Sequence, residues 1–184
     1  QLGLVHRDLG DYPAAQAYLV ASLELSREIN DKTGIAQALR LLGDLDHRRG
    51  DYTSVISMLN ESLELYKEAY DDEGTIDALT DMGDVSFSMG DIENGTHVLE
   101  EALSLAREIN DKRRTAGALQ RLGFLSWNGG EYELTLERLN EALRIYKDMG
   151  DRNGISTVHN TMGSTFHMVA KLTEARQHYK DSLK

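Results

Sequence analysis

The chain has 184 residues, a formal net charge of −11, 28% charged residues and no cysteine. The acidic balance argues against a nucleic-acid partner, which needs a basic face, and weakly against an anionic membrane surface. Without cysteine there are no disulfides or thiolate metal sites, and no apolar run approaches the ~20 residues that span a bilayer. The composition therefore predicts a folded cytoplasmic protein, or a fragment of a longer one.

Two short phrases repeat along the chain at steps of 40 residues. The first is Leu-Gly or Met-Gly, at Leu2-Gly3, Leu42-Gly43, Met82-Gly83, Leu122-Gly123 and Met162-Gly163. The second is a turn, at Gly10-Asp11-Tyr12, Gly50-Asp51-Tyr52, Gly90-Asp91-Ile92, Gly130-Glu131-Tyr132 and a degenerate Ala170-Lys171-Leu172. A fixed period of roughly 20–50 residues is typical of a solenoid of stacked repeats.

Each repeat is predicted to consist of helix A, a tight turn, helix B and a polar break. Asp11 can cap a helix whose first turn holds Pro13, Gly50 ends the next helix, and Asp51 starts the one after it. The polar breaks are Asn30-Asp31-Lys32 and its equivalents. The expected helices are 1–9, 11–29, 32–49, 51–69, 72–89, 91–109, 112–129, 131–148, 152–169 and 171–183. The expected organisation is one array: a partial repeat 1–30, repeats 31–70, 71–110 and 111–150, and a partial repeat 151–184.

Small residues at fixed register predict close packing between the helices. Glycine inside a helix costs about 1 kcal/mol relative to alanine, so its recurrence at Gly43 and its equivalents implies that another helix backbone crosses there. Helix B carries small or medium residues, then large ones, then small ones again. The three sets are Ala15, Val55, Gly95, Thr135, Ala175; Leu19, Leu59, Leu99, Leu139, Tyr179; and Ser22, Ser62, Ala102, Ala142, Ser182.

These residues resemble the tetratricopeptide repeat, in which Leu-Gly lies in helix A and a small–large–small series marks helix B. The resemblance covers the whole chain and implies an all-α fold, a right-handed superhelix of about ten antiparallel helices. The 40-residue form is similar to the sensor regions of bacterial signal-transducing ATPases and transcription regulators. It is also similar to an animal adaptor for G-protein α subunits. The adaptor's asparagine ladder and the carboxylate clamp of chaperone adaptors are both missing here, so neither ligand is carried over.

In such an array the A helices line a concave groove, and the residues outside the packing register face it. The resemblance therefore implies a binding surface, with no catalytic residue and no cofactor. Its expected members are Gln37, Arg40, Asp44, His47, Asp77, Asp81, Asp84, Phe87, Gln120, Arg121, Phe124, Trp127, Asn128, Asn160, Ser164 and His167.

Two groups within this surface suggest what binds. Phe124 and Trp127 share a helix face, and aromatic anchors concentrate binding energy at interfaces; alternatively, one or both fill gaps between helices. Asp77, Asp81 and Asp84 also share a face, where a basic partner would relieve their repulsion. The alternatives are a solvated acidic face or, less favoured, a divalent-cation site. We expect a peptide with a basic part on the aspartates and an apolar part on the aromatics, its backbone or an acidic residue held by Arg40, Gln120, Arg121 and Asn160.

The leading functional hypothesis is a protein-interaction scaffold without catalysis. The alternative is an effector-sensing or autoinhibitory region of a larger ATPase or transcription regulator. A third reading is self-association through uncapped ends that expose Leu2, Val5, Leu172 and Leu183. No histidine pair has the i, i+4 spacing of a helical metal site, and His159 takes a packing position. No phosphate-binding loop appears either, because Gly129-Gly130 is a turn without a following Gly-Lys-Ser/Thr.

Overall fold

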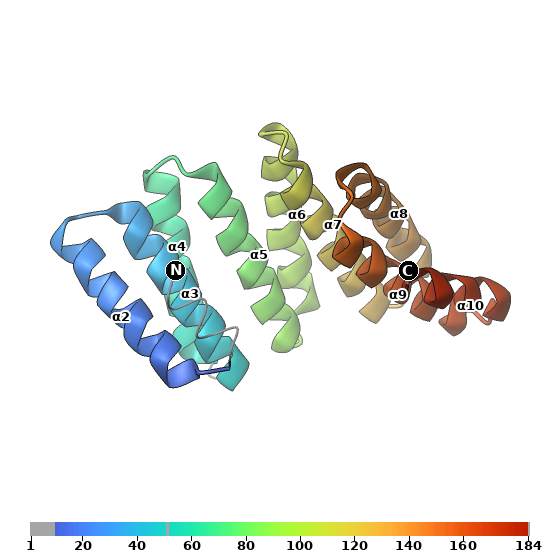
Figure 1. Ribbon diagram of the computed structural model, residues 1–184, viewed down its shortest axis with the longest axis horizontal. Helices are drawn as coiled ribbons and strands as arrows, with labels where there is room; N and C mark the ends of the chain where they lie inside the picture. Colours follow the sequence, from blue (N-terminus) through green and yellow to red (C-terminus); the bar gives the residue numbers. More distant parts are fainter. Residues whose placement is uncertain (1–9, 51, 184) are drawn as a thin grey trace. The chain divides into compact units, whose positions relative to one another are not determined.

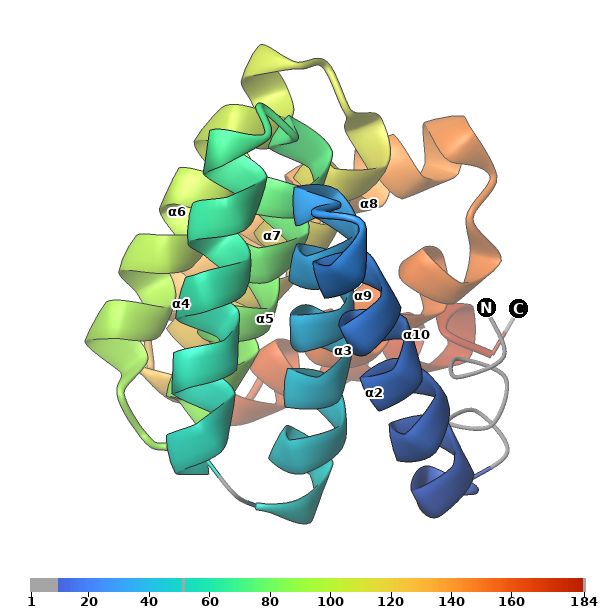
Figure 2. The ribbon, with the colours of Figure 1, turned by 90° about the vertical axis from the view of Figure 1, so that its left-hand side faces the viewer.

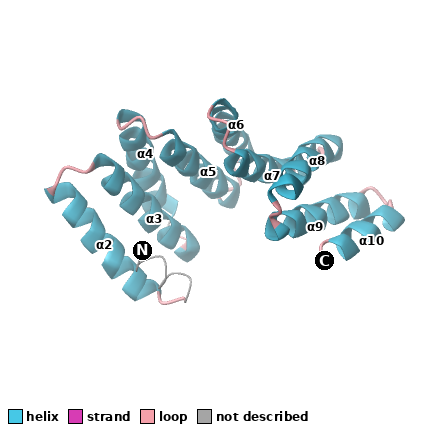
Figure 3. Ribbon diagram, turned by 45° about the horizontal axis from the view of Figure 1, so that its top comes forward, coloured by secondary structure: helices cyan, strands magenta, loops and turns pink. Residues whose placement is uncertain are grey.

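The computed structural model describes residues 10–50 and 52–183, which are helical except for short turns (Figures 1 and 3). Within these ranges there is no β-strand, and the fold is the predicted all-α, tetratricopeptide-like solenoid. The helices are α2 (Tyr12–Glu28), α3 (Lys32–Arg49), α4 (Tyr52–Glu68), α5 (Asp72–Ser88), α6 (Ile92–Glu108), α7 (Lys112–Asn128), α8 (Tyr132–Met149), α9 (Arg152–Met168) and α10 (Leu172–Asp181).

Most expected helix boundaries agree with these to within a residue or two. The last helix is shorter than expected and ends at Asp181. The expected helix over 1–9, with Leu2 and Val5, and the expected start at Asp51 lie outside the described residues.

The turns between helices use the left-handed backbone conformation. Gly50 has φ 83° and ends α3, as predicted. Four residues other than glycine adopt the same conformation at the ends of their helices, Asn30, Tyr70, Asn110 and Ala170, with φ between 54° and 59°. This conformation costs roughly 1–2 kcal/mol without glycine. The geometry of the turn is therefore kept even where glycine is lost.

The predicted polar breaks are helix caps. Asp31, Asp71, Asp111 and Asp151 each accept a hydrogen bond from the backbone N–H three residues later, at 2.8–3.0 Å. Asp11 caps α2 in the same way at 3.2 Å, with Pro13 in the first turn as expected. Each cap satisfies one N–H that the helix itself leaves without a partner.

The chain divides into two compact units, Gln1–Asp91 and Ile92–Lys184. In the first, α2 packs on α3, α3 on α4 and α4 on α5, and α3 also contacts α5 (Figure 2). In the second, α6 packs on α7, α7 on α8, α8 on α9 and α9 on α10, and α7 also contacts α9. Both units thus show the same pattern, in which each helix packs on the next and one pair of alternate helices is also in contact. A single array over all 184 residues remains a prediction.

The small–large register fills the core of each unit. Leu59 lies on Gly43, Leu139 on Gly123 and Tyr179 on Gly163, so the close partner of each glycine is chiefly a side chain and not the expected backbone. Ser62, Ala102 and Ala142 are buried as predicted, whereas Ser22 and Ser182 are not. Ser22 lies on α2 and Ser182 follows the end of α10, and these two helices each pack extensively on only one other described helix. No described helix is long and apolar enough to cross a membrane.

Candidate functional site

A pocket opens in the first unit where α3, α4 and α5 meet. It holds about 250 Å³ of empty space, including open solvent. We call it the α3–α5 pocket, and its lining residues are Gly43, Asp44, His47, Val55, Leu59, Asp81, Asp84 and Val85.

The floor of the pocket is apolar. Val55, Leu59 and Val85 are at most 3% exposed and form one hydrophobic cluster. Gly43 lies beside this cluster, and a Cβ atom placed there would meet Leu59 at 3.6 Å, an ordinary contact. A glycine at this position therefore leaves space in the pocket that a side chain would fill.

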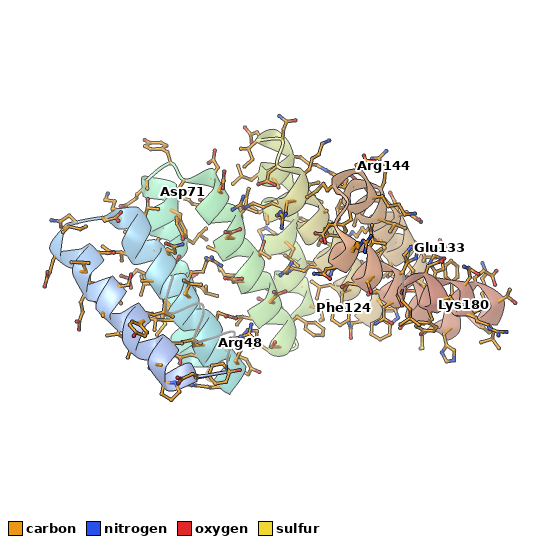
Figure 4. All side chains as sticks on the ribbon, viewed as in Figure 1. Arg48, Asp71, Phe124, Glu133, Arg144 and Lys180 are labelled. Atoms are coloured by element: carbon orange, nitrogen blue, oxygen red, sulfur yellow. The ribbon has the colours of Figure 1, made fainter. Side chains whose placement is uncertain are left out.

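The rim of the pocket is acidic. Arg40 donates to Asp81 at 2.8 Å and lies 3.8 Å from Asp77, and Arg48 lies 3.2 Å from Asp44 (Arg48 is labelled in Figure 4). The pairing of Arg40 with the aspartates of α5 was not predicted, because the partners are far apart in sequence and lie on different helices. This internal cation relieves part of the repulsion that a basic partner was expected to relieve.

The carboxyl group of Asp81 has a raised pKa despite this ion pair. Burial raises the pKa of its carboxyl from the ordinary 3.8 to about 6, although Arg40 acts in the opposite direction. The nearby carboxylates Asp84 and Asp44 add to the upward shift. The carboxylate of Asp81 is thus incompletely compensated by its protein partners, and an added cation would stabilise its charged form.

His47 closes one side of the pocket. Its Nε2 lies 2.8 Å from the hydroxyl of Ser88, and its ring lies 5.7 Å from that of Tyr52, centroid to centroid. The neighbouring helices α4 and α5 therefore hold the ring by two contacts, one apolar and one polar.

The structure brings together four of the residues predicted for the first half of the surface. Asp44, His47, Asp81 and Asp84 line the pocket, while Arg40 and Asp77 are joined to it through the ion pairs. Gln37 and Phe87 are not among the lining residues. Sequence reasoning missed the floor, since Val55, Leu59 and Val85 read only as core positions.

The second unit holds the predicted aromatic pair on α7. The rings of Phe124 and Trp127 are stacked, with centroids 5.8 Å apart and an interplanar angle of 22° (Phe124 is labelled in Figure 4). The side chain of Phe124 is 39% exposed. The indole Nε1 of Trp127 is buried and has no hydrogen-bond partner among the described residues. Phe124 is therefore the accessible member of the pair, and Trp127 supports it.

Two hydrogen bonds join predicted residues of the second unit to their own helices. Asn128 donates to the carbonyl of Phe124 at 2.9 Å, and Ser164 donates to that of Asn160 at 3.2 Å. Gln120 and Arg121 are half-buried, and His167 is exposed. Among the residues described, no group of three or more His, Asp or Glu side chains is placed to hold a metal ion.

Comparisons with known proteins identify the class of these repeats. The family model described as tetratricopeptide repeat matches residues 1–68, and the model described as anaphase-promoting complex subunit 5 matches residues 45–126. The first match covers residues 1–68, and the helix pairs described above have the tetratricopeptide-like fold. A search of curated proteins gave no match.

Solved structures share this fold at low sequence identity. BtubC (BKLC) from P. vanneervenii has a TM-score of 0.81 and 17% identity over 91% of this chain and 70% of its own. Aspartyl phosphate phosphatase F from Bacillus subtilis has a TM-score of 0.85 and 12% identity, over 98% of this chain and 48% of its own. A Rap protein complexed with competence and sporulation factor has a TM-score of 0.82 and 14% identity, over 98% and 51%. The chain thus spans about half the length of the last two.

Proposed function

We propose that this chain is a protein-interaction module, and that its α3–α5 pocket binds a basic side chain of a peptide or protein segment. The observation that carries this proposal is the pairing of a buried apolar floor with an acidic rim in one pocket. Lysine and arginine combine an apolar stem with a charged head, so each fits both parts.

The charge balance around the pocket favours a cation. Asp44, Asp77, Asp81 and Asp84 contribute four carboxylates, and the guanidinium groups of Arg40 and Arg48 lie among them. One charge-assisted hydrogen bond contributes roughly 1.5–3 kcal/mol. A single side chain therefore binds weakly, and a useful affinity requires further contacts along the segment.

The apolar part of the proposed partner surface belongs to the second unit. The half-exposed ring of Phe124, backed by Trp127, offers a flat contact for an aliphatic or aromatic side chain. This apolar contact is proposed within the second unit alone, independently of the α3–α5 pocket.

The second candidate function is that of a sensor or autoinhibitory region of a larger regulator. The Rap protein complexed with competence and sporulation factor favours it, because the same fold is there seen with a bound factor. In that reading the same pocket would receive the effector, and its acidic rim would again select a cationic group.

A pair of matched peptides tests the proposed pocket. One is Gly-Ser-Arg-Ser-Gly, and the other carries citrulline, a neutral isostere, in place of arginine. NMR titration of the full chain should shift the amides of Gly43, Asp44 and Val85 with the arginine peptide only. Asp84→Asn should weaken these shifts, and Glu64→Gln, an exposed acidic position on α4, should not. Equal shifts with citrulline, or shifts confined to other helices, would contradict the proposal.

The affinity for the arginine peptide should also depend on pH. Since the pKa of Asp81 is about 6, its carboxyl is largely protonated at pH 5 and ionised at pH 7.5. Arginine binding should therefore strengthen severalfold as pH rises between these values. Affinity that is unchanged, or that falls, over this range would remove Asp81 from the site.

A further inference from the structure

Two histidines meet in the contact between α9 and α10. His159, on α9, is only 7% exposed, and His178, on α10, is half-buried. Their Nδ1 atoms lie 2.9 Å apart, and their ring centroids are 5.1 Å apart. The ring of His178 also stacks on Phe166, with centroids 5.1 Å apart and an interplanar angle of 17°.

This distance limits the number of protons in the contact. At 2.9 Å one Nδ1 donates and the other accepts, so the pair holds when both rings are neutral or when one is protonated. When both rings are protonated, each Nδ1 carries a hydrogen, and two donors with like charges face each other. The hydrogen bond is then lost and the charges repel.

The surroundings of the pair disfavour the second proton. Burial lowers the pKa of His178, Asp181 on its own helix acts to raise it, and Lys147 on α8 lowers it further. A group whose pKa is lowered by folding contributes stability above its ordinary pKa of about 6.5, and this stability is lost as pH falls through the lowered value.

Further contacts join α10 to α9 beside the histidine pair. Among the described helices α10 packs extensively only on α9. Polar contacts beside the histidine pair include Ser156 donating to the carbonyl of Ser182 at 2.5 Å, and Ser164 with Tyr179 at 3.2 Å. In a repeat fold, stability is approximately a sum over neighbouring elements, so the α9–α10 contact can be lost while the other helix pairs stay folded.

We propose that the His159–His178 contact is a proton-sensitive clasp, which holds α10 on α9 at neutral pH and releases it when both rings are protonated. Release withdraws Tyr179 from Gly163 and uncovers that face of α9. The device acts within the second unit and does not depend on what the α3–α5 pocket binds.

Amide hydrogen exchange of the full chain tests the clasp, with rates expressed as protection factors to remove the intrinsic pH dependence. Protection in α10 should fall severalfold from pH 7.5 to pH 5, while protection in α7 stays constant. In His178→Asn the amide occupies the position of Nδ1 without titrating, so protection in α10 should be the same at both pH values. His97→Asn, which alters an exposed histidine of α6, should keep the fall seen in the unmodified chain.

An equal fall in His178→Asn, or no fall in the unmodified chain, would overturn the proposal. A second measurement does not depend on how the variant folds. Nitrogen NMR of the unmodified chain at pH 7.5 should find one of the two rings with its hydrogen on Nδ1. If both rings carry it on Nε2 instead, neither Nδ1 can donate and the clasp does not exist.

Discussion

Glycine occupies the same register position in successive A helices, but the space beside it differs from repeat to repeat. A Cβ atom at Gly43 would lie 3.6 Å from Leu59, whereas a Cβ atom at Gly123 would lie only 2.8 Å from Leu139. The first distance is an ordinary contact and the second is not. The sequence period identifies both positions, but only the three-dimensional contacts separate them.

Alanine substitution at the two glycines should therefore give opposite results. Gly43→Ala should raise the free energy of unfolding by up to about 1 kcal/mol, because alanine favours the helix and meets no clash. Gly123→Ala should lower it by about 1–3 kcal/mol, because Leu139 must move. Urea unfolding of both variants measures the two effects. Destabilisation of similar size in both would show that the packing around Gly43 is tighter than described.

Gly43→Ala also has a functional consequence, since its methyl group enters the α3–α5 pocket. The variant should bind the arginine peptide more weakly although it is more stable. This separates loss of binding from loss of folding at a single residue.

Other residues show what a period alone cannot predict. The ring of Tyr66 covers Gly74 so closely that a Cβ atom would lie 2.3 Å from it. Forty residues further on, both positions differ at once: tyrosine is replaced by Ala106 and glycine by Arg114. In this repeat the small residue is on the earlier helix, α6, and the large one on the later helix, α7, the reverse of Tyr66 on α4 and Gly74 on α5. Sequence analysis found the recurrent positions, but this compensation becomes visible only once the contact is known.

At the scale of helices, the sequence predicted the fold well because local signals agree. Aspartate at each polar break accepts a hydrogen bond from the following helix, and the left-handed turns recur with the period. These interactions join residues a few positions apart, so a pattern reveals them. The ion pair of Arg40 with Asp81 joins two helices instead, and the pattern did not reveal it.

The contribution of the helix caps to stability can be tested with two matched variants. Asp151 accepts a hydrogen bond from Gly154 at the start of α9, whereas Glu131 makes no side-chain cap at the start of α8. Asp151→Ala should therefore cost about 1 kcal/mol of stability, and Glu131→Ala a few tenths at most. Urea unfolding again supplies the measurement. A similar cost for both would mean that the capping bond does not account for the recurrent aspartate.

At the scale of the whole molecule, repetition provides the framework and the exceptions to it provide the candidate function. The same helical hairpin recurs in both units, yet the aromatic pair on α7 and the histidine pair arise from residues that their equivalents in other repeats do not share. The α3–α5 pocket combines recurrent residues such as Gly43 and Leu59 with Asp81, which is leucine or arginine in the neighbouring repeats. The fold could be predicted from the sequence because every repeat repeats the same information. The candidate site was predicted only in part, because its floor consists of residues that also serve the core.

The most direct test of the proposed function is selection of short random peptides on the immobilised full chain. The account predicts that recovered peptides are enriched in lysine and arginine relative to the starting library. It also predicts that Glu64→Gln preserves this enrichment and that the double variant Asp44→Asn/Asp84→Asn abolishes it. Recovery of neutral or acidic peptides, the same enrichment on the double variant, or no enrichment at all would contradict a pocket for basic side chains.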